Sequence, residues 1–493
     1  MSNSSSQLKR GLKNRHIQLI AMGGAVGTGL FLGSAQVIQS AGPSIILGYA
    51  IVGLVAFLIM RQMGEMIVEE PVVGSFSYFA QKYWGRFPGF LSGWNYWVVY
   101  ILVAMTELTA VAKYVHYWWP HIPAWVSVLF FFVLVTCLNL GNVKFYGESE
   151  FWLAIIKVAA VISMIVFGLY LLLTAGNDSI ASFSNLWQHG GFFPHGFSGL
   201  FYMLAFLMFA FGGIELIGMT AAEAENPEKS IPQAINQVIF RILVFYVASL
   251  AIIMSLIPWN QLDLGGLDKS PFVMIFSQLG IGWAAHLLNF IILTAALSVY
   301  NSGMYANSRM LYGLAVQGNA PKVFAKVSKQ GVPTSAVIFS SILIFGCVLL
   351  NYFIPEEALS YLMYMAVAAL VLNWAIISFT HLKFKRSMKL ENKIAKFPAL
   401  FSPLSNYIVL TFIGMILYIM WTQGFEKSVI IIPIWIAFMF GLYTILSWKK
   451  SLKSSNKAYS NKISLYYFGV YKQFAFRTNQ SCHMPISNLI HNN

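Results

Sequence analysis

Residues 18–40 read QLIAMGGAVGTGLFLGSAQVIQS, an apolar stretch without a charged residue that is interrupted by a cluster of glycines. A helix needs about 20 mainly apolar residues to cross a bilayer, so the stretch is long enough to span one. Glycine weakens a helix by roughly 1 kcal/mol relative to alanine. Gly23, Gly24, Gly27 and Gly29 together therefore favour an opened turn in the middle of the span.

Apolar stretches of similar length recur along the 493-residue chain. Hydrophobic residues make up 58% of it and charged residues only 10%, whereas a soluble domain carries about 25% charged residues. Such a chain cannot cover a water-facing surface, and backbone groups in lipid must bond within their own segment, so long spans are helices. The sequence predicts an all-α integral membrane protein. Its twelve predicted transmembrane helices are Gln18–Ser40, Pro43–Met60, Phe87–Ala112, Pro123–Leu140, Phe151–Leu173, Gly196–Thr220, Val238–Ile257, Ile281–Ser302, Ser335–Phe353, Leu359–Thr380, Tyr407–Met420 and Ser428–Trp448.

The positions of the basic residues support twelve spans and indicate their orientation. With an even number of helices both termini lie on one side of the membrane, and that side then receives nearly all of the 31 Lys and Arg residues. Only Lys113, Lys269 and Lys427 fall on the other side, and Lys157 lies within a span. Because cytoplasmic loops are enriched in Lys and Arg, both termini are predicted to be cytoplasmic. This placement explains the net charge of +14 without a nucleic-acid partner.

The sixth predicted span contains a second glycine interruption, FAFGGIE at residues 209–215. An opened turn in a membrane leaves amides and carbonyls unpaired, which is tolerated only where the turn lines a cavity. Free amides at a helix N-terminus attract a carboxylate, and free carbonyls can hold an ammonium group, so two such turns predict a site for a zwitterion. Interrupted spans at matching positions of two repeats are typical of transporters. The alternative is that the glycines allow close helix packing, a spacing that Gly23 and Gly27 fit.

Several motifs identify a family. HIQLIA at 16–21, GTGLF at 27–31, FGGIEL at 211–216 and TAAEAENPEKSIP at 220–232 closely resemble the amino-acid transporter family of the amino acid–polyamine–organocation superfamily. SGWNYW at 92–97, LSVYNSG at 297–303 and VQGNAP at 316–321 resemble most the bacterial phenylalanine-specific and general aromatic amino-acid permeases. The likeness extends from about Leu8 to about Trp448.

The resemblance implies a LeuT-type fold, with inverted five-helix repeats at about 16–173 and 196–380 and two extra helices at about 407–448. The twelve-helix transporter domain then covers residues 16–448, between a cytoplasmic arm at 1–15 and a basic cytoplasmic tail of unknown role at 449–493. The resemblance further implies import of amino acids through the bacterial inner membrane by proton symport and alternating access, and no cofactor is expected. Aromatic substrates (Phe, Tyr and Trp) are expected; another neutral amino acid or 4-aminobutyrate stays open, as does a channel or a non-transporting sensor.

The resemblance also implies roles for individual residues. The amides of Thr28 and Gly29 bind the substrate carboxylate, and the carbonyls of Ala25, Phe209 and Gly212 bind its amine. The ring of Phe209 is then a gate over the substrate.

Three ionisable residues lie well inside apolar stretches, and each needs a partner or a cavity because a buried charge is costly in a membrane. The resemblance suggests that the ammonium of Lys157 occupies the space that sodium holds between the first and eighth helices of other members, and that it couples transport to protons. The alternative is a lysine that only reaches the interface. Glu215 is either a proton carrier or a structural hydrogen-bond partner of the broken helix. Glu107 is a third proton-coupling candidate, with a structural role as its alternative.

The remaining polar residues give weaker signals. Tyr96 and Tyr100 lie one turn apart on the third predicted helix and are gate or side-chain pocket candidates. His286 is the only histidine that we expect near a span interior, where a hydrogen-bonded histidine at a helix end is the favoured interpretation. The three cysteines match no metal-binding spacing, and the spans contain no metalloprotease motif or nucleophile elbow. We therefore expect no metal site and no enzymatic activity, and the oligomeric state stays open.

Overall fold

The computed structural model describes residues 13–15, 17–18, 27–141, 143–176, 179–262 and 270–448, with backbone only at 143–147 and 222. Every regular element within these ranges is helical, which confirms the all-α prediction. Contacts divide the chain into two compact units, Met1–Ile434 and Trp435–Asn493. The sites described below all lie in the first unit. The tail at 449–493 and most of the N-terminal arm lie outside the described residues.

The first half of the helical elements runs from the described part of the first predicted span to the end of the fifth. They are α2 (Thr28–Phe31), α3 (Gly33–Ala41), η1 (Gly42–Ser44), α4 (Ile45–Glu69), α5 (Ser75–Phe79), η2 (Ala80–Trp84), α6 (Arg86–His116), α7 (Ala124–Leu140) and α8 (Val143–Leu173).

The second half begins with a short helix that precedes the sixth predicted span. These elements are α9 (Asn185–Gln188), α10 (Gly196–Phe209), α11 (Leu216–Thr220), η3 (Ala221–Glu223), α12 (Pro227–Arg241), η4 (Ile242–Ala248), α13 (Ser249–Leu256), η5 (Trp259–Gln261), α14 (Pro271–Gln278), α15 (Gly282–Val316), η6 (Lys322–Ala325), α16 (Thr334–Ile344), α17 (Gly346–Phe353), α18 (Ala358–Leu390) and α19 (Leu404–Thr422). A further apolar helix covers Glu426–Trp448.

Nine helical segments in the described part of the chain are long and apolar enough to cross a membrane, and Ala124–Leu140 and Gly196–Phe209 are shorter apolar helices. One of the nine, Thr28–Glu69, contains parts of two predicted spans. Its halves are divided at Gly42, whose φ of 60° lies in the left-handed region that glycine adopts most easily.

Some predicted boundaries are wrong for identifiable reasons. The seventh predicted span begins earlier, because Pro227 starts a helix that continues through η4 into α13, and proline is well suited to the first helical turn. The eighth extends to Val316 rather than Ser302. The eleventh is longer than predicted, because α19 begins directly after Pro403.

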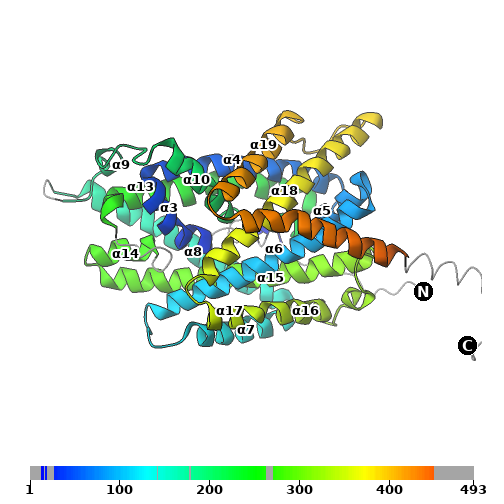
Figure 1. Cartoon of the computed structure of the whole chain (residues 1–493), viewed down its shortest axis with the longest axis horizontal. Helices are drawn as coiled ribbons and strands as arrows, with labels where there is room; N and C mark the ends of the chain where they lie inside the picture. Colours follow the sequence, from blue (N-terminus) through cyan, green and yellow to red (C-terminus); the bar gives the residue numbers. More distant parts are fainter. Residues whose placement is uncertain are drawn as a thin grey trace, which may run out of the picture. The chain divides into compact units, whose positions relative to one another are not determined.

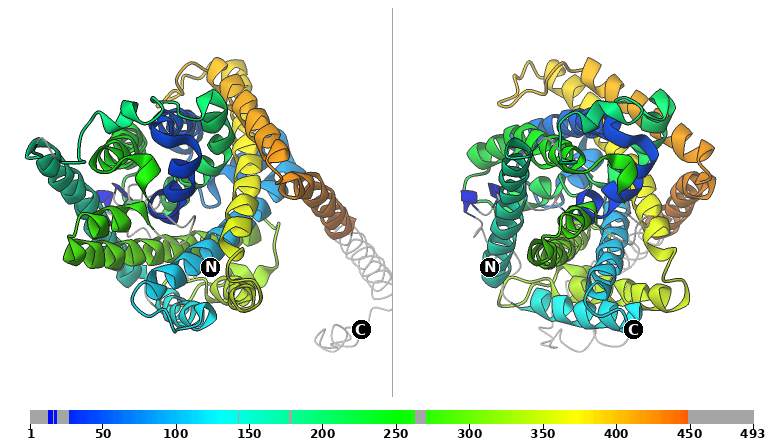
Figure 2. Two further views of the ribbon diagram at one scale, coloured as in Figure 1. Left: turned by 60° about the vertical axis from the view of Figure 1, so that its left-hand side comes forward. Right: turned by 90° about the vertical axis from the view of Figure 1, so that its left-hand side faces the viewer.

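The centre of the first unit is built around α6. This helix packs along α15 and also against α18, which crosses it (Figure 1). In the described part of the first span, α3 lies beside α10 (Figure 2). The two glycine-interrupted segments therefore share a neighbourhood, with α6 and α15 in contact with α2.

Candidate functional site

The sixth span is broken as the sequence predicts. Helix α10 ends at Phe209, a turn follows, and α11 begins at Leu216. The amides of Ala210, Phe211 and Gly212 each donate to the carbonyl three residues earlier, at 3.1 Å. Gly213 has a φ of 109°, a conformation that residues with a side chain rarely adopt. The backbone conformation at the break therefore favours a glycine at position 213, within the glycine pair from which the break was predicted.

The side chain of Glu215 holds this break in place. It is fully buried. One carboxylate oxygen accepts a hydrogen bond of 3.1 Å from the amide of Gly213, and the other accepts one from the indole nitrogen of Trp374 on α18. Both bonds fit a structural role, in which Glu215 is a hydrogen-bond partner of the broken helix rather than a proton carrier.

The first span resumes as a helix at Thr28, with Gly27 extended before it. Ala25 and the upstream glycines lie outside the described residues, so the opened turn itself stays a prediction. A Cβ atom on Gly29 would lie only 2.6 Å from the Cα atom of Ala210. The two interrupted segments therefore meet in direct backbone contact, which only glycine permits at this position.

A carboxylate lies at the start of α2. The hydroxyl of Thr28 donates to Glu107 at 2.6 Å, and the amide of Thr28 lies 3.4 Å from both carboxylate oxygens. Both residues are buried, with exposures of 1% and 2%. Carboxylates are favoured at helix N-termini. Glu107 of α6 thus occupies the position that the resemblance assigns to the substrate carboxylate.

A small cavity lies where the two breaks meet. Its volume is about 10 Å³, whereas ligand sites usually enclose about 300–1,000 Å³, so the site is closed in this conformation. The lining residues are Gly27, Gly29, Val103, Glu107, Phe209, Ala210, Gly212 and Val299. The structure thus gathers the predicted Gly29, Phe209 and Gly212 around Glu107.

The two gate candidates on α6 do not line this cavity. The rings of Tyr96 and Tyr100 are buried and lie 4.8 Å apart between centroids. Tyr96 also contacts Phe76 at 4.6 Å. They form an aromatic layer on α6, further toward the N-terminus of that helix than Val103 and Glu107.

Two other tyrosines, which sequence reasoning missed, contact the broken segments. The hydroxyl of Tyr49 on α4 donates to the carbonyl of Gly29 at 3.3 Å, and that of Tyr246 in η4 donates to the carbonyl of Ala210 at 2.7 Å. Their ring centroids lie 5.1 Å apart. Each satisfies a carbonyl of an interrupted segment, but nothing in their local sequences distinguishes them from packing residues.

Lys157 is fully buried in α8, which rules out the alternative of a lysine that reaches the interface. Its ammonium donates a hydrogen bond of 2.9 Å to the hydroxyl of Ser298 on α15. This contact joins the fifth and eighth predicted spans. The part of the first span that the resemblance places beside Lys157 lies outside the described residues.

More charges are buried than the sequence indicated, because they lie near span ends whose surroundings resemble loops. Arg309 of α15 pairs with Glu223 of η3 at 3.0 Å, and both side chains are almost fully buried. His286 is exposed, lies near the start of α15 and accepts a hydrogen bond of 3.0 Å from the indole nitrogen of Trp118, as expected of a satisfied histidine at a helix end. His381, which sequence reasoning missed, is fully buried in α18 and lies 2.8 Å from Glu65. Glu150 and Arg241 are also buried.

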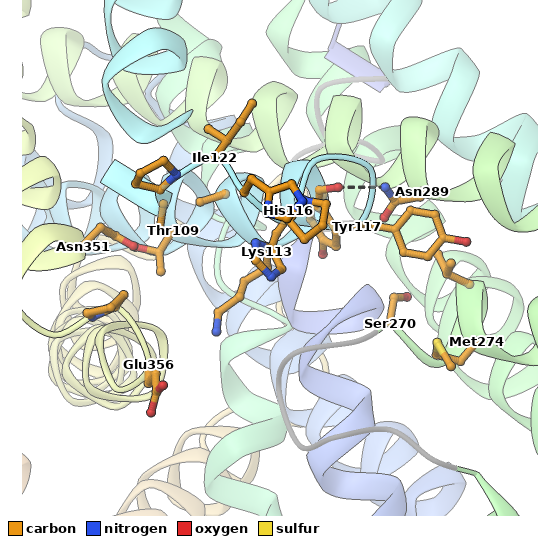
Figure 3. A pocket seen from close by; sticks show the side chains of 18 residues that line it. Thr109, Lys113, His116, Tyr117, Ile122, Ser270, Met274, Asn289, Asn351 and Glu356 are labelled. Carbon is orange, nitrogen blue, oxygen red and sulfur yellow. Dashed lines mark hydrogen bonds between the residues drawn. The ribbon is translucent and has the colours of Figure 1, made fainter. Parts of the chain in front are cut away.

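A larger cavity of about 730 Å³ lies at the end of α6 (Figure 3). Figure 3 shows the side chain of Lys113 with Glu356 on one side and Ser270 on the other, both from elements other than α6. Asn351 and Asn289 contribute polar walls, the latter donating to the carbonyl of Tyr114 at 2.9 Å. Thr109 also lines the cavity, and it follows Glu107 closely in α6. The cavity thus approaches the site from the end of α6.

Residues 16–455 match the family described as amino acid permease. The chain belongs to the amino acid permease family. It is 61% identical over 431 residues to the aromatic amino acid transport protein AroP of Escherichia coli K12, a match that covers 87% of this chain and 94% of that protein. The Salmonella typhimurium LT2 protein of the same name is 60% identical with the same coverage.

A more distant member is the amino acid permease YtnA of Bacillus subtilis, which is 44% identical over 447 residues, 90% of this chain and 96% of that protein. The family that the sequence motifs indicated is thereby confirmed. The family consists of permeases and not of enzymes, as the sequence predicts.

Proposed function

We propose that this permease is a secondary active transporter that imports aromatic amino acids by proton symport with alternating access. The observation that carries the proposal is the direct contact between two glycine-interrupted segments, at Gly29 and Ala210. The aromatic class of substrate is supported by the name of relatives that share 61% of their residues with this chain.

In the proposed complex the broken segments bind both ends of the zwitterion. The amides of Thr28 and Gly29 hold the carboxylate, and the carbonyls of Ala25, Phe209 and Gly212 hold the ammonium group. The ring of Phe209 has to move before a substrate enters, because the cavity beside it is far smaller than an amino acid. The layer of Tyr96 and Tyr100 then lies on the path beyond the site.

Glu107 links substrate binding to a proton. Its carboxylate bonds Thr28, where the substrate carboxylate is proposed to bind, and two carboxylates in contact cannot both stay charged at low cost. Protonation of Glu107 therefore favours release of Thr28 and binding of substrate. Lys157 is the second coupling residue: its buried ammonium donates to Ser298, and loss of its proton removes a charge whose burial is costly.

The architecture proposed is twelve spans in two inverted repeats with two extra helices, in the bacterial inner membrane with both termini cytoplasmic. The division of Thr28–Glu69 and the two shorter apolar helices support the count, and the bacterial relatives support the location. The cavity of about 730 Å³ at the end of α6 is then the outer entrance. The buried pair Arg309–Glu223 helps to close the inner side.

Radiolabelled phenylalanine uptake into proteoliposomes, with an imposed pH gradient and a panel of competitors, tests the proposal. Saturable uptake that follows the gradient and is competed best by Phe, Tyr and Trp is expected. Best competition by lysine or 4-aminobutyrate would refute the aromatic assignment. Single-channel currents would indicate a channel, and binding without flux a sensor. Lys157→Ala is expected to abolish accumulation driven by the pH gradient.

A further inference from the structure

One buried carboxylate has no part in the mechanism so far. Glu150 of α8 is fully buried. The hydroxyl of Ser298 donates to one of its oxygens, and the amide of Asn301 lies 3.5 Å from the other. A carboxylate inside a membrane protein is costly and usually marks a functional site.

Glu150 is connected to Lys157 through a single hydroxyl. The ammonium of Lys157 donates to the oxygen of Ser298 at 2.9 Å, and the same hydroxyl donates onward to Glu150. The two charged residues lie about two turns apart on α8, roughly 10 Å of helix rise. Ammonium, hydroxyl and carboxylate thus form one continuous line of hydrogen bonds between α8 and α15.

This line leads from the interior toward water. Glu148 lies two residues before Glu150 on the same helix. It is exposed and pairs with Arg15 at 2.9 Å. Glu150 is therefore the last buried acid before the water-exposed end of α8, on the side proposed to face the cytoplasm. Lys157 lies deeper along the helix.

The surrounding charges balance one another. The groups that act on Lys157 are the carboxylates of Glu150 and Glu107 and the guanidinium of Arg241 at the end of α12. Arg241 is itself buried. Two cations and two anions make the cluster neutral, so a proton that arrives on Glu107 with substrate leaves one excess positive charge. In a low-dielectric interior such an excess favours loss of another proton from the cluster.

We infer that Glu150 is the residue through which Lys157 releases its proton toward the cytoplasm, an inference that rests on the proposed coupling role of Lys157. The ammonium of Lys157 gives a proton to the Ser298 oxygen while the hydroxyl proton of Ser298 passes to the Glu150 carboxylate. The products are a neutral amine, an intact hydroxyl and a neutral carboxylic acid. Glu150 then loses its proton to water, and Asn301, held by Asn139 at 2.8 Å, keeps its carboxylate in place.

The test compares two transport modes in proteoliposomes containing the full chain. Net uptake driven by a pH gradient needs proton release in every cycle, whereas exchange of internal for external phenylalanine does not. Glu150→Gln and Ser298→Ala are expected to lower net uptake by about 100-fold, the usual effect of removing a positioned proton-transfer group, while exchange continues. Ser298→Thr keeps a hydroxyl and is expected to restore net uptake. Glu148→Gln, the exposed neighbour on the same helix, is the matched control and should behave as wild type.

The outcomes separate this inference from the proposed function. Wild-type net uptake in Glu150→Gln would overturn the role of Glu150. Equal loss of both modes in Glu150→Gln, with normal net uptake in Ser298→Ala, would show a structural role only and also overturn it. Accumulation that persists in Lys157→Ala would instead refute the proposed coupling role of Lys157. Absence of phenylalanine exchange by the wild type would refute the proposed function itself.

Discussion

Replacing Glu107 with glutamine is expected to uncouple substrate binding from pH. In the wild type the charged carboxylate bonds the hydroxyl and lies near the amide of Thr28, so a substrate carboxylate at the proposed site has to displace it. At acidic pH Glu107 is protonated and substrate binds tightly; at alkaline pH it is charged and substrate binds weakly. Glu107→Gln has no charge at either pH and is expected to bind tightly at both.

The size of the effect follows from the hydrogen bonds that the charge makes. A bond to a charged group contributes about 1.5–3 kcal/mol and a neutral one about 0.5–1.5 kcal/mol. Glutamine can keep a neutral bond to Thr28, so the substitution removes about 1–2 kcal/mol of competition. At about 1.4 kcal/mol per factor of ten, the variant is expected to bind phenylalanine about 5- to 30-fold more tightly than wild type at alkaline pH, with little difference at acidic pH.

Scintillation-proximity binding of radiolabelled phenylalanine to purified protein, at one acidic and one alkaline pH, measures this difference. Thr28→Ser keeps the hydroxyl that bonds Glu107 and serves as the control, with the pH dependence of the wild type. The reasoning is refuted if Glu107→Gln shows the same pH dependence as wild type. It is also refuted if a folded Glu107→Gln protein binds no substrate at either pH, since Glu107 would then be a binding group rather than a competitor.

Three further substitutions test the packing around the site by thermal unfolding of the purified protein. Gly29→Ala places a methyl group 2.6 Å from the backbone of the other broken segment and should destabilise the protein by about 1–3 kcal/mol. Gly414→Ala is the control, because a Cβ atom there meets no described atom within 4 Å, and it should have no such effect. Trp374→Phe removes the donor to Glu215 and is expected to cost about 1–3 kcal/mol, because a buried acceptor loses its partner; an unchanged transition would contradict the structural role of Glu215. Glu65→Ala removes the acceptor of two buried donors, His381 and the amide of Ala399, and of the partly exposed Lys385. It is expected to cost about 3–5 kcal/mol, and a loss below about 1 kcal/mol would mean that water replaces the carboxylate.

The sequence predicted those parts of the fold that depend on local chemistry. Long apolar segments have to be helices in lipid, so the predicted spans fall on described helices, several of which extend beyond the predicted ends. The break after Phe209 was predictable because it needs a glycine, and Gly213 adopts a conformation that favours one. Resemblance supplied what local chemistry could not, namely the substrate class and the roles of Thr28 and Phe209.

The contacts that give the site its chemistry join residues that are distant in sequence. Glu107 and Thr28 meet only because α6 packs against α2, and a single sequence does not say which face of α6 lies there. Glu150 escaped notice because it lies beside the exposed Glu148, in a segment whose charges resemble those of a loop. Its burial depends on α15, which supplies Ser298.

The position of Glu107 gives a physical reason for the proposed coupling to protons. A helix that begins inside a membrane protein has donors that need an acceptor in every conformation, whether or not substrate is bound. Glu107 supplies that acceptor for Thr28, and it thereby becomes a competitor of any substrate carboxylate. A proton on Glu107 neutralises its carboxylate, which ends the competition with the substrate carboxylate and leaves no uncompensated buried charge. By this reasoning Glu107→Gln should still move phenylalanine down its own gradient, and the lost property should be accumulation against that gradient.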